Sequence, residues 1–227
     1  MKFLTFPLLI LMSTNFFAAH HEKDEKTVSN EYVLLSTYEI SSGQNPADLE
    51  KELINLQKTQ LENGYNDCGV YRHHFGGQRA FYTFCLFDDL NHFAKIMDKT
   101  LSATQSTSPQ SYSAHTDNIV KVLERNATKI HPFLLLSKFD WGPYLTGSGQ
   151  IESANKLFSA YKRSFGECNL SQHRFGPEMA VYITCGFKDY ADFAVKATSL
   201  DEIWSKELMD EKLDIRNHSD DLLILVE

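Results

Sequence analysis

Two stretches of sequence, 100 residues apart, decide the fold: CGVYRHHFGGQRAFYTFCLF at 68–87 and CNLSQHRFGPEMAVYITCGF at 168–187. They align without gaps, and both cysteines, a histidine, a Phe-Gly pair and a tyrosine recur at matching places. Shorter matches flank them, with Leu-Leu-Ser at 34–36 and 135–137 and His-Thr/Ser-Asp at 115–117 and 218–220. Such self-similarity at a nearly constant spacing predicts an internal repeat.

Each copy predicts the same order of elements. Apolar runs of strand length lie at 32–39 and 133–140. A helix follows, with Asn45 as N-cap, Pro46 in the first turn and Gly64 at its end, and its counterpart carries an apolar stripe over 151–165 that ends at Gly166. A hairpin, a short helix near 90–97 and a last strand at 119–123 or 222–226 complete the copy. The order β-α-β-β-α-β is the ferredoxin-like unit.

We therefore predict an α+β fold in which two ferredoxin-like repeats, at 32–125 and 131–227, pack sheet to sheet as a pseudo-dimeric α+β barrel. By its element order the pattern resembles the dimeric α+β barrel superfamily in single-chain, tandem form. That superfamily includes antibiotic-biosynthesis-type monooxygenases, haem-degrading and haem-binding enzymes and stress-response proteins. The resemblance covers most of residues 32–227 and implies a fold; no catalytic motif of a member is found here.

The four cysteines, at 68, 85, 168 and 185, are placed for disulfides. If Gly76-Gly77 is a two-residue hairpin turn, counting outward along both strands places Cys68 opposite Cys85. The same count about Gly176-Pro177 places Cys168 opposite Cys185. Both would be non-hydrogen-bonded pairs, in which side chains approach closely enough for a disulfide. A metal site is the alternative, but the chain has no C-x-x-C spacing.

Alternation along the hairpin sorts its side chains between two faces. The cysteine face is assigned to the helices. The opposite face, which would look into the space between the sheets, carries Tyr71, His73, Phe75, Tyr82 and Phe84 in the first copy. In the second copy it carries Asn169, Ser171, His173, Phe175, Tyr182 and Thr184. An aromatic interior with a few polar groups is typical of a small-molecule pocket. We take Tyr71, His73, Tyr82, His173 and Tyr182 as candidate ligand-binding residues; the alternative is that the two histidines are partly solvated residues near a turn.

The repeated triplets give secondary candidates, His115 with Asp117 and His218 with Asp220. A histidine beside a carboxylate can act as a base or a ligand. The alternative is a structural role in a turn at the entry to the last strand, where such residues form hydrogen bonds with the local backbone. Three further stretches are assigned by composition: 99–114 as a loop, 197–217 as largely helical, and 140–150 as a loop with aromatic residues.

The N-terminus predicts export. Lys2 is followed by an apolar run and by Ala18-Ala19, which indicates a secretory signal at 1–19 with a disordered mature segment at 20–31. An uncleaved anchor is the alternative, but the apolar run is short and interrupted. The net charge of −8, which loss of Lys2 would make more negative, disfavours nucleic acid as a partner. No later segment is apolar enough to span a membrane, and the exported compartment permits disulfides.

Three functions remain open. The first is an exported protein, periplasmic or secreted, that binds a small apolar or aromatic molecule between the repeats. The second, implied by the resemblance, is a cofactor-free oxygenase or a haem-handling enzyme, and the third is a structural or interaction module with a packed interior. Catalytic residues, cofactor, ligand identity and oligomeric state stay unassigned, and no metal site is predicted.

Overall fold

The computed structural model describes residues 29–40, 42–77, 79–102, 109–127, 129–144 and 147–226. The predicted signal at 1–19 and most of the segment at 20–31 lie outside the described residues. The first half of the chain contains β1 (Tyr32–Ile40), α1 (Pro46–Asn63), β2 (Asp67–Gly76), β3 (Ala80–Phe87), α2 (Leu90–Ser102) and β4 (Tyr112–Arg125). The second half contains β5 (Phe133–Trp141), α3 (Gly147–Phe165), β6 (Cys168–Phe175), β7 (Ala180–Phe187), α4 (Tyr190–Ile203), the π-helical turn η1 (Trp204–Leu208) and β8 (Ile215–Leu225).

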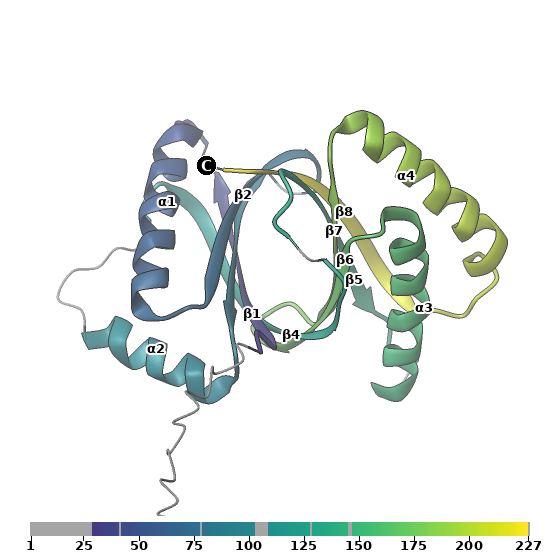
Figure 1. The fold of residues 1–227 in the computed structure, drawn as a ribbon, viewed down its shortest axis with the longest axis horizontal. Coiled ribbons are helices and arrows are strands. Elements are labelled where there is room, and N and C mark those ends of the chain that lie inside the picture. The colour runs from purple at the N-terminus through teal and green to yellow at the C-terminus, as the bar shows by residue number, and fades with distance from the viewer. Residues whose placement is uncertain are drawn as a thin grey trace, which may run out of the picture.

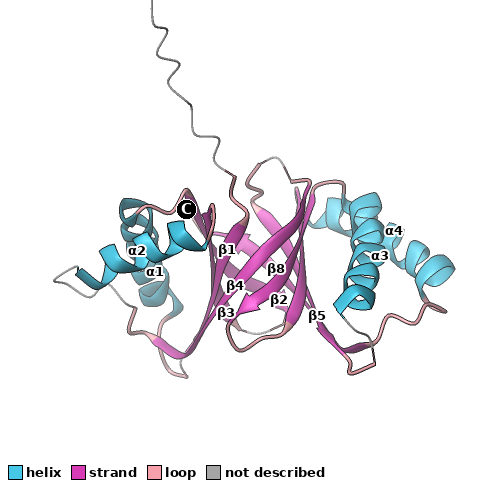
Figure 2. Ribbon diagram, turned by 90° about the horizontal axis from the view of Figure 1, so that it is seen from below, coloured by secondary structure: helices cyan, strands magenta, loops and turns pink. Residues whose placement is uncertain are grey.

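The eight strands form one closed barrel in the order β1-β3-β2-β8-β5-β7-β6-β4, with all neighbours antiparallel. Figure 1 looks down this barrel, and Figure 2 shows it from the side with α1 and α2 on one flank and α3 and α4 on the other. Each half contributes a four-stranded sheet, and the two sheets are joined edge to edge by the β2–β8 and β4–β6 pairs. The predicted face-to-face packing is thus realised as closure, which satisfies the polar backbone groups of all four edge strands.

The helix boundaries follow from their caps. The Asn45 side chain accepts a hydrogen bond from the Ala47 backbone N–H at 3.2 Å, and Pro46 opens α1. Gly64 ends α1 in the left-handed region, at φ 119°, where its backbone N–H donates to the carbonyls of Gln60 and Leu61. Leu49 and Leu53, four residues apart, are fully buried against the sheet. The predicted helix start and end are therefore confirmed.

Alternation along the strands creates an inner and an outer apolar core. The outer cores lie between the sheet and the helices, with Phe81 and Phe87 in the first half and Phe139 and Phe187 in the second. The inner core lies within the barrel and includes Tyr71, Tyr82 and Tyr182 with valines and leucines of the other strands. The sequence assigned these two faces correctly for the strand segments near the cysteines.

The end of the hairpin departs from that assignment. A register shift between His73 and Phe75 in the β2–β8 pair disrupts the alternation, and Phe75 lies exposed outside the barrel. Phe175 is exposed in the same way. The interior positions predicted for these two phenylalanines are therefore wrong, because counting from the turn assumes an unbroken ladder.

The repeated glycines at 76 and 176 have a steric role at this end of the barrel. Both have positive φ, and a Cβ at Gly76 would lie 2.4 Å from the backbone oxygen of Asp220. A Cβ at Gly176 would lie 2.5 Å from the backbone oxygen of Asp117. Glycine therefore lets each hairpin approach the last strand of the other half closely.

Both predicted disulfides are present, Cys68–Cys85 and Cys168–Cys185, each with a Cα–Cα distance of 4.1 Å. The cysteines face one another in the β2–β3 and β6–β7 ladders, as the hairpin count predicted. Among the described residues there is no free cysteine.

Several predicted boundaries are wrong. The last strands begin earlier than expected, so the triplets at 115–117 and 218–220 lie within β4 and β8 and not in entry turns. The strand pattern was missed because these segments are polar on both faces. The stretch 197–217 is helical only to Leu208, and the stretch 99–114 contains the end of α2 and the start of β4. The predicted loop 140–150 is shortened at both ends by β5 and α3.

We expect each disulfide to stabilise the protein independently, because each closes a loop of 17 residues. Replacing Cys68 and Cys85 together by serine should lower the free energy of unfolding by about 3 kcal/mol in the chain-entropy description. Chemical denaturation of the oxidised protein measures this, and the Cys168→Ser/Cys185→Ser variant serves as the matched pair. Equal stability of all three proteins would contradict the expectation.

Candidate functional site

One end of the barrel interior contains a cavity of about 310 Å³. Its wall is mainly apolar or aromatic and its rim is polar. The lining residues used below are Asp67, Gly69, Tyr71, Phe84, Leu86, Arg125, Lys129, His131, Leu136, Asn169, Ser171, Tyr182, Thr184 and Gly186. The connection between β4 and β5 crosses this end of the barrel (Figure 1), and its residues 127 and 129–131 form part of the cavity wall.

The cavity exists because the two halves carry side chains of unequal size at matching positions. At the repeat spacing of 100, three large residues of the first half correspond to three small residues of the second: Tyr71 to Ser171, Phe84 to Thr184, and Leu86 to Gly186. Gly69 of the first half, which corresponds to Asn169 of the second, leaves further space in the cavity. A barrel with large residues in both halves would fill this volume, since protein interiors pack densely.

The connection over the cavity is tied to both halves. The Tyr71 hydroxyl donates to the backbone oxygen of His131 at 3.1 Å, and the His131 ring contacts Glu167 through an Nε2–Oε2 distance of 2.8 Å. A Cβ at Gly186 would lie 2.1 Å from His131 Cδ2, so only glycine admits the ring there. Burial, and then the nearby charge of Asp67, raise the pKa of Tyr71 to about 12. Tyr71 is therefore a neutral phenol and a hydrogen-bond donor at physiological pH.

The opposite end of the barrel is closed by polar side chains. Asp221, on β8, is buried and accepts hydrogen bonds from the Tyr82 hydroxyl to Oδ2 at 2.6 Å and from His73 Nδ1 to Oδ1 at 2.7 Å. Burial and the charge of Asp221 raise the pKa of Tyr82. These contacts place two predicted site residues, Tyr82 and His73, in a network that seals the barrel.

The second half closes the same end with different residues. The Tyr182 hydroxyl donates to Glu178 Oε2 at 3.0 Å, and Lys138 Nζ lies 2.8 Å from Glu178 Oε1. Asn118 follows the triplet at 115–117 as Asp221 follows the triplet at 218–220, and its side chain donates to Glu178 at 3.2 Å. Burial and the charge of Glu178 raise the pKa of Tyr182. The Tyr182 ring also lines the cavity, so it connects the two ends of the interior.

His173 lacks the partner that its counterpart has. Its Nδ1 is buried and makes no hydrogen bond within the described part of the chain. In the first half the equivalent nitrogen, on His73, meets Asp221; in the second half Asn118 occupies the place of that aspartate and bonds Glu178 instead. His173 is not among the residues that line the cavity.

The secondary candidates lie outside the barrel, on the helix side of the sheet. His115 and Asp117 are 3.0 Å apart (Nε2–Oδ1), and the Ser36 hydroxyl donates to the same carboxylate oxygen at 2.5 Å. Burial would raise the pKa of Asp117, but the hydrogen bonds from His115 and Ser36 outweigh it and hold that pKa below its usual range.

The second half repeats this arrangement. His218 Nε2 lies 3.1 Å from Asp220 Oδ1, and the Ser137 hydroxyl donates to the same oxygen. His115 stacks on Tyr38 and His218 on Phe139, each with ring centroids 4.3 Å apart. The two clusters therefore anchor the sheet to its outer core.

Two further pockets lie beside these clusters, between the sheet and the helices. The pocket of the first half measures about 170 Å³ and includes Asp117 and His115. The pocket of the second half measures about 530 Å³ and is walled by aromatic residues, among them Phe165, Tyr190 and Phe193, with Asp220 in its lining. Neither contains any of the five primary candidates.

Of those five candidates, the structure brings Tyr71 and Tyr182 to the cavity, and Tyr82 and His73 to the hydrogen-bond network of the closed end. His173 lies opposite Val120, at the place in the second half that corresponds to His73, and belongs neither to the cavity lining nor to that network. Sequence reasoning missed Asp221, Glu178 and His131. It placed Ser171 and Thr184 on the inner face but did not recognise that these small residues, with Gly186, leave a cavity. The unequal side-chain sizes at matched positions were a usable signal for the last group. No group of three or more metal-ligating side chains occurs in the described ranges.

Comparison with known proteins gives the fold. No protein-family description and no curated protein matches the sequence. Among solved structures, an anthrone oxidase-like protein superposes with a TM-score of 0.58 at 10% identity, covering 88% of this chain and 94% of that chain. A putative monooxygenase from Fusobacterium nucleatum gives 0.56 at 10% identity over 86% and 92%, and one from Lactobacillus acidophilus gives 0.52 at 7% over 86% and 94%. The predicted resemblance to dimeric α+β barrel proteins is thus confirmed for the fold.

The hydrogen bonds at the closed end lead to a prediction about the stability of the fold. Asp221→Asn keeps the shape of the side chain but removes the charge that receives the Tyr82 and His73 hydrogen bonds. We expect the free energy of unfolding to fall by about 1–3 kcal/mol, the range for hydrogen bonds to buried charged groups. The control Asp220→Asn, on the same strand but half-exposed, should cost less than about 1 kcal/mol. Equal losses in urea denaturation would refute a special role for Asp221.

Proposed function

We propose that this protein is an exported binder of a small apolar or aromatic molecule, held in the barrel cavity. The observation that carries the proposal is the space of about 310 Å³ at the open end of the barrel, lined by Tyr71, Phe84, Leu136 and Tyr182 among others. This volume is at the lower end of the range for ligand pockets, and it equals roughly ten waters at their share of liquid volume, about 30 Å³ each. A compact molecule of about ten non-hydrogen atoms would therefore fill it.

The make-up of the wall supports the same ligand class. Buried aromatic and aliphatic side chains favour an apolar body, and the polar side chains in the lining would orient it. The packed-module alternative requires a filled interior, whereas the small residues Ser171, Thr184 and Gly186 leave one end of the barrel open. We also propose that the two halves, at 32–125 and 131–227, are copies of one ancestral unit that diverged at these positions.

An enzyme is the second candidate function, and one observation favours it. His131 lines the cavity and contacts a carboxylate of Glu167 at 2.8 Å, the pairing that a general base uses. The names of the structural neighbours, anthrone oxidase-like protein and putative monooxygenase, also suggest an enzyme. The buried tyrosines, being neutral phenols, supply hydrogen bonds and not base catalysis.

The barrel cavity does not fit a haem. Haem iron requires an axial side chain such as histidine or tyrosinate. The Tyr71 hydroxyl is already used as a donor to the backbone oxygen of His131. The space of about 310 Å³, at the lower end of the range for ligand pockets, is also too small for a macrocycle of haem size. A haem-handling activity is therefore not assigned to this cavity.

Exchange of matched residues between the halves tests the binding proposal. Ser171→Tyr and Thr184→Phe give the second half the side chains that the first half carries, and should fill the cavity without loss of stability. The double variant should bind 2-naphthol at least tenfold more weakly than the wild type, measured by the fluorescence of the probe. Val195→Phe, which adds an aromatic ring at an exposed helix position, is the control and should bind as the wild type does.

Two other results would count against the proposal. If the double variant binds 2-naphthol as tightly as the wild type, the ligand lies elsewhere. If the wild type binds no probe and protein from its own host retains no small molecule in native mass spectrometry, the packed-module alternative replaces the proposal. Oxygen consumption with bound 2-naphthol that is lost in His131→Ala would favour the enzyme.

Export is proposed on two grounds: the N-terminal pattern at 1–19 and the two disulfides, which persist in oxidising compartments. Among the described helices none is long and apolar enough to cross a membrane. The intact mass of protein isolated from its host should correspond to a chain that begins at His20 and lacks four cysteine hydrogens. A mass that includes residues 1–19 would contradict cleavage, and one with four thiols would contradict the compartment.

A further inference from the structure

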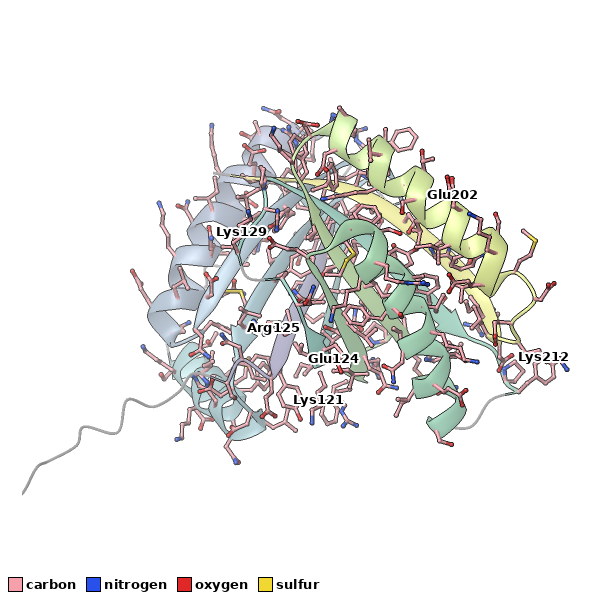
Figure 3. The ribbon with its side chains drawn as sticks, turned by 45° about the vertical axis from the view of Figure 1, so that its right-hand side comes forward. Lys121, Glu124, Arg125, Lys129, Glu202 and Lys212 are labelled. Carbon is pink, nitrogen blue, oxygen red and sulfur yellow. A yellow bond between two sulfur atoms is a disulfide. The ribbon has the colours of Figure 1, made fainter. Side chains whose placement is uncertain are left out.

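The charges at the mouth of the cavity differ in sign from the charge of the protein. The chain carries a net charge of −8, yet the charged residues that line the cavity are Arg125 and Lys129 against the single acid Asp67. Arg125 is the last residue of β4 and donates through Nη2 to the backbone oxygen of Asn30 at 2.7 Å. Lys129 lies on the connection to β5, and Figure 3 shows both cationic side chains in one view of this part of the molecule.

The carboxylates near the mouth have partners within the protein. Asp67 Oδ1 accepts the backbone N–H of Cys68 at 2.9 Å. Glu167 contacts His131 at 2.8 Å and lies 3.9 Å from Lys129 (Oε1–Nζ). The long distance to Lys129, whose side chain is two-thirds exposed, makes that ion pair weak. Among the residues that line the cavity, two cations, Arg125 and Lys129, therefore stand against one carboxylate, Asp67.

Hydrogen-bond donors add to this pattern. Asn169 lines the cavity, and its Oδ1 accepts the backbone N–H groups of Asn126 and Ala127 at 3.1 Å each. The remaining polar group of that side chain is its amide NH₂, which only donates. A rim with two cations and an amide donor is complementary to an anion, while the wall below it is complementary to an aromatic or aliphatic body.

We infer that the ligand is a small organic acid with an aromatic or branched apolar body, whose carboxylate meets Arg125, Lys129 and Asn169 at the mouth. This inference rests on the proposed function, because it assumes that the barrel cavity is the binding site. Arginine suits the role, since its planar guanidinium matches a carboxylate in shape and charge.

Three probes of similar size and different charge test the inference: 3-phenylpropionate, 3-phenylpropanol and 3-phenylpropylamine. Their dissociation constants are measured at pH 7 by calorimetry with the wild type and with the double variant Arg125→Gln/Lys129→Gln. We expect the wild type to bind the acid about tenfold more tightly than the alcohol and to bind the amine most weakly. In the double variant the advantage of the acid should fall below about twofold, with the affinity for the alcohol unchanged.

The matched control also removes two positive charges, but at positions far from the mouth of the cavity. Lys206→Gln/Lys212→Gln changes two exposed lysines beyond α4, and it should keep the full preference for the acid. High salt should reduce that preference in the wild type, because exposed charges are screened.

The possible failures are distinguishable. If the alcohol or the amine binds as tightly as the acid, and Ser171→Tyr/Thr184→Phe abolishes that binding, the anion inference is wrong while the barrel site stands. If the acid is preferred but the preference persists in Arg125→Gln/Lys129→Gln, the recognition assigned to these residues is wrong. If none of the three probes binds, both the inference and the proposed function fail.

Discussion

Hydrogen bonding between the edge strands of the two halves is the constraint on which the rest of the structure depends. Each four-stranded sheet alone would present two unpaired edges, and the β2–β8 and β4–β6 ladders remove all of them. Closure turns one face of every strand inward, where it is shielded from solvent, and leaves the other face for the helices. The inner aromatic cluster, the cavity and the polar closed end are all consequences of that enclosure.

Inside the barrel, corresponding side chains of the two halves meet at one end and differ in size at the other. At the closed end, large and polar residues of both halves meet, and Tyr82 and Tyr182 each bond a carboxylate. Burial of Asp221 is tolerated because its carboxylate has hydrogen-bond partners. At the other end the second half has small residues opposite large ones, so a space remains. The same twofold arrangement of strands therefore produces a sealed end and a hollow end.

The hollow end has the make-up that the proposed binding of a small molecule requires. Its tyrosine hydroxyl is neutral and is used to hold the connection between the halves, and its wall offers apolar area with a donor-rich rim. The His131–Glu167 contact is the feature that links this site to acid–base chemistry. The connection between β4 and β5 thus has two roles: it joins the halves, and it supplies cavity-lining side chains.

The sequence alone determined the element order, the helix caps, the pairing of the cysteines and the inward-facing side of the hairpins. These features are local, since capping, alternation and hairpin register act between residues close in the chain or related by the repeat. Tertiary structure alone decided that the sheets close edge to edge, that a bulge at His73 turns Phe75 outward, and that Asp221 meets Tyr82 across 139 positions of sequence. It also decided where the cavity lies, because a void depends on which side chains face each other across the barrel, and no local pattern records that.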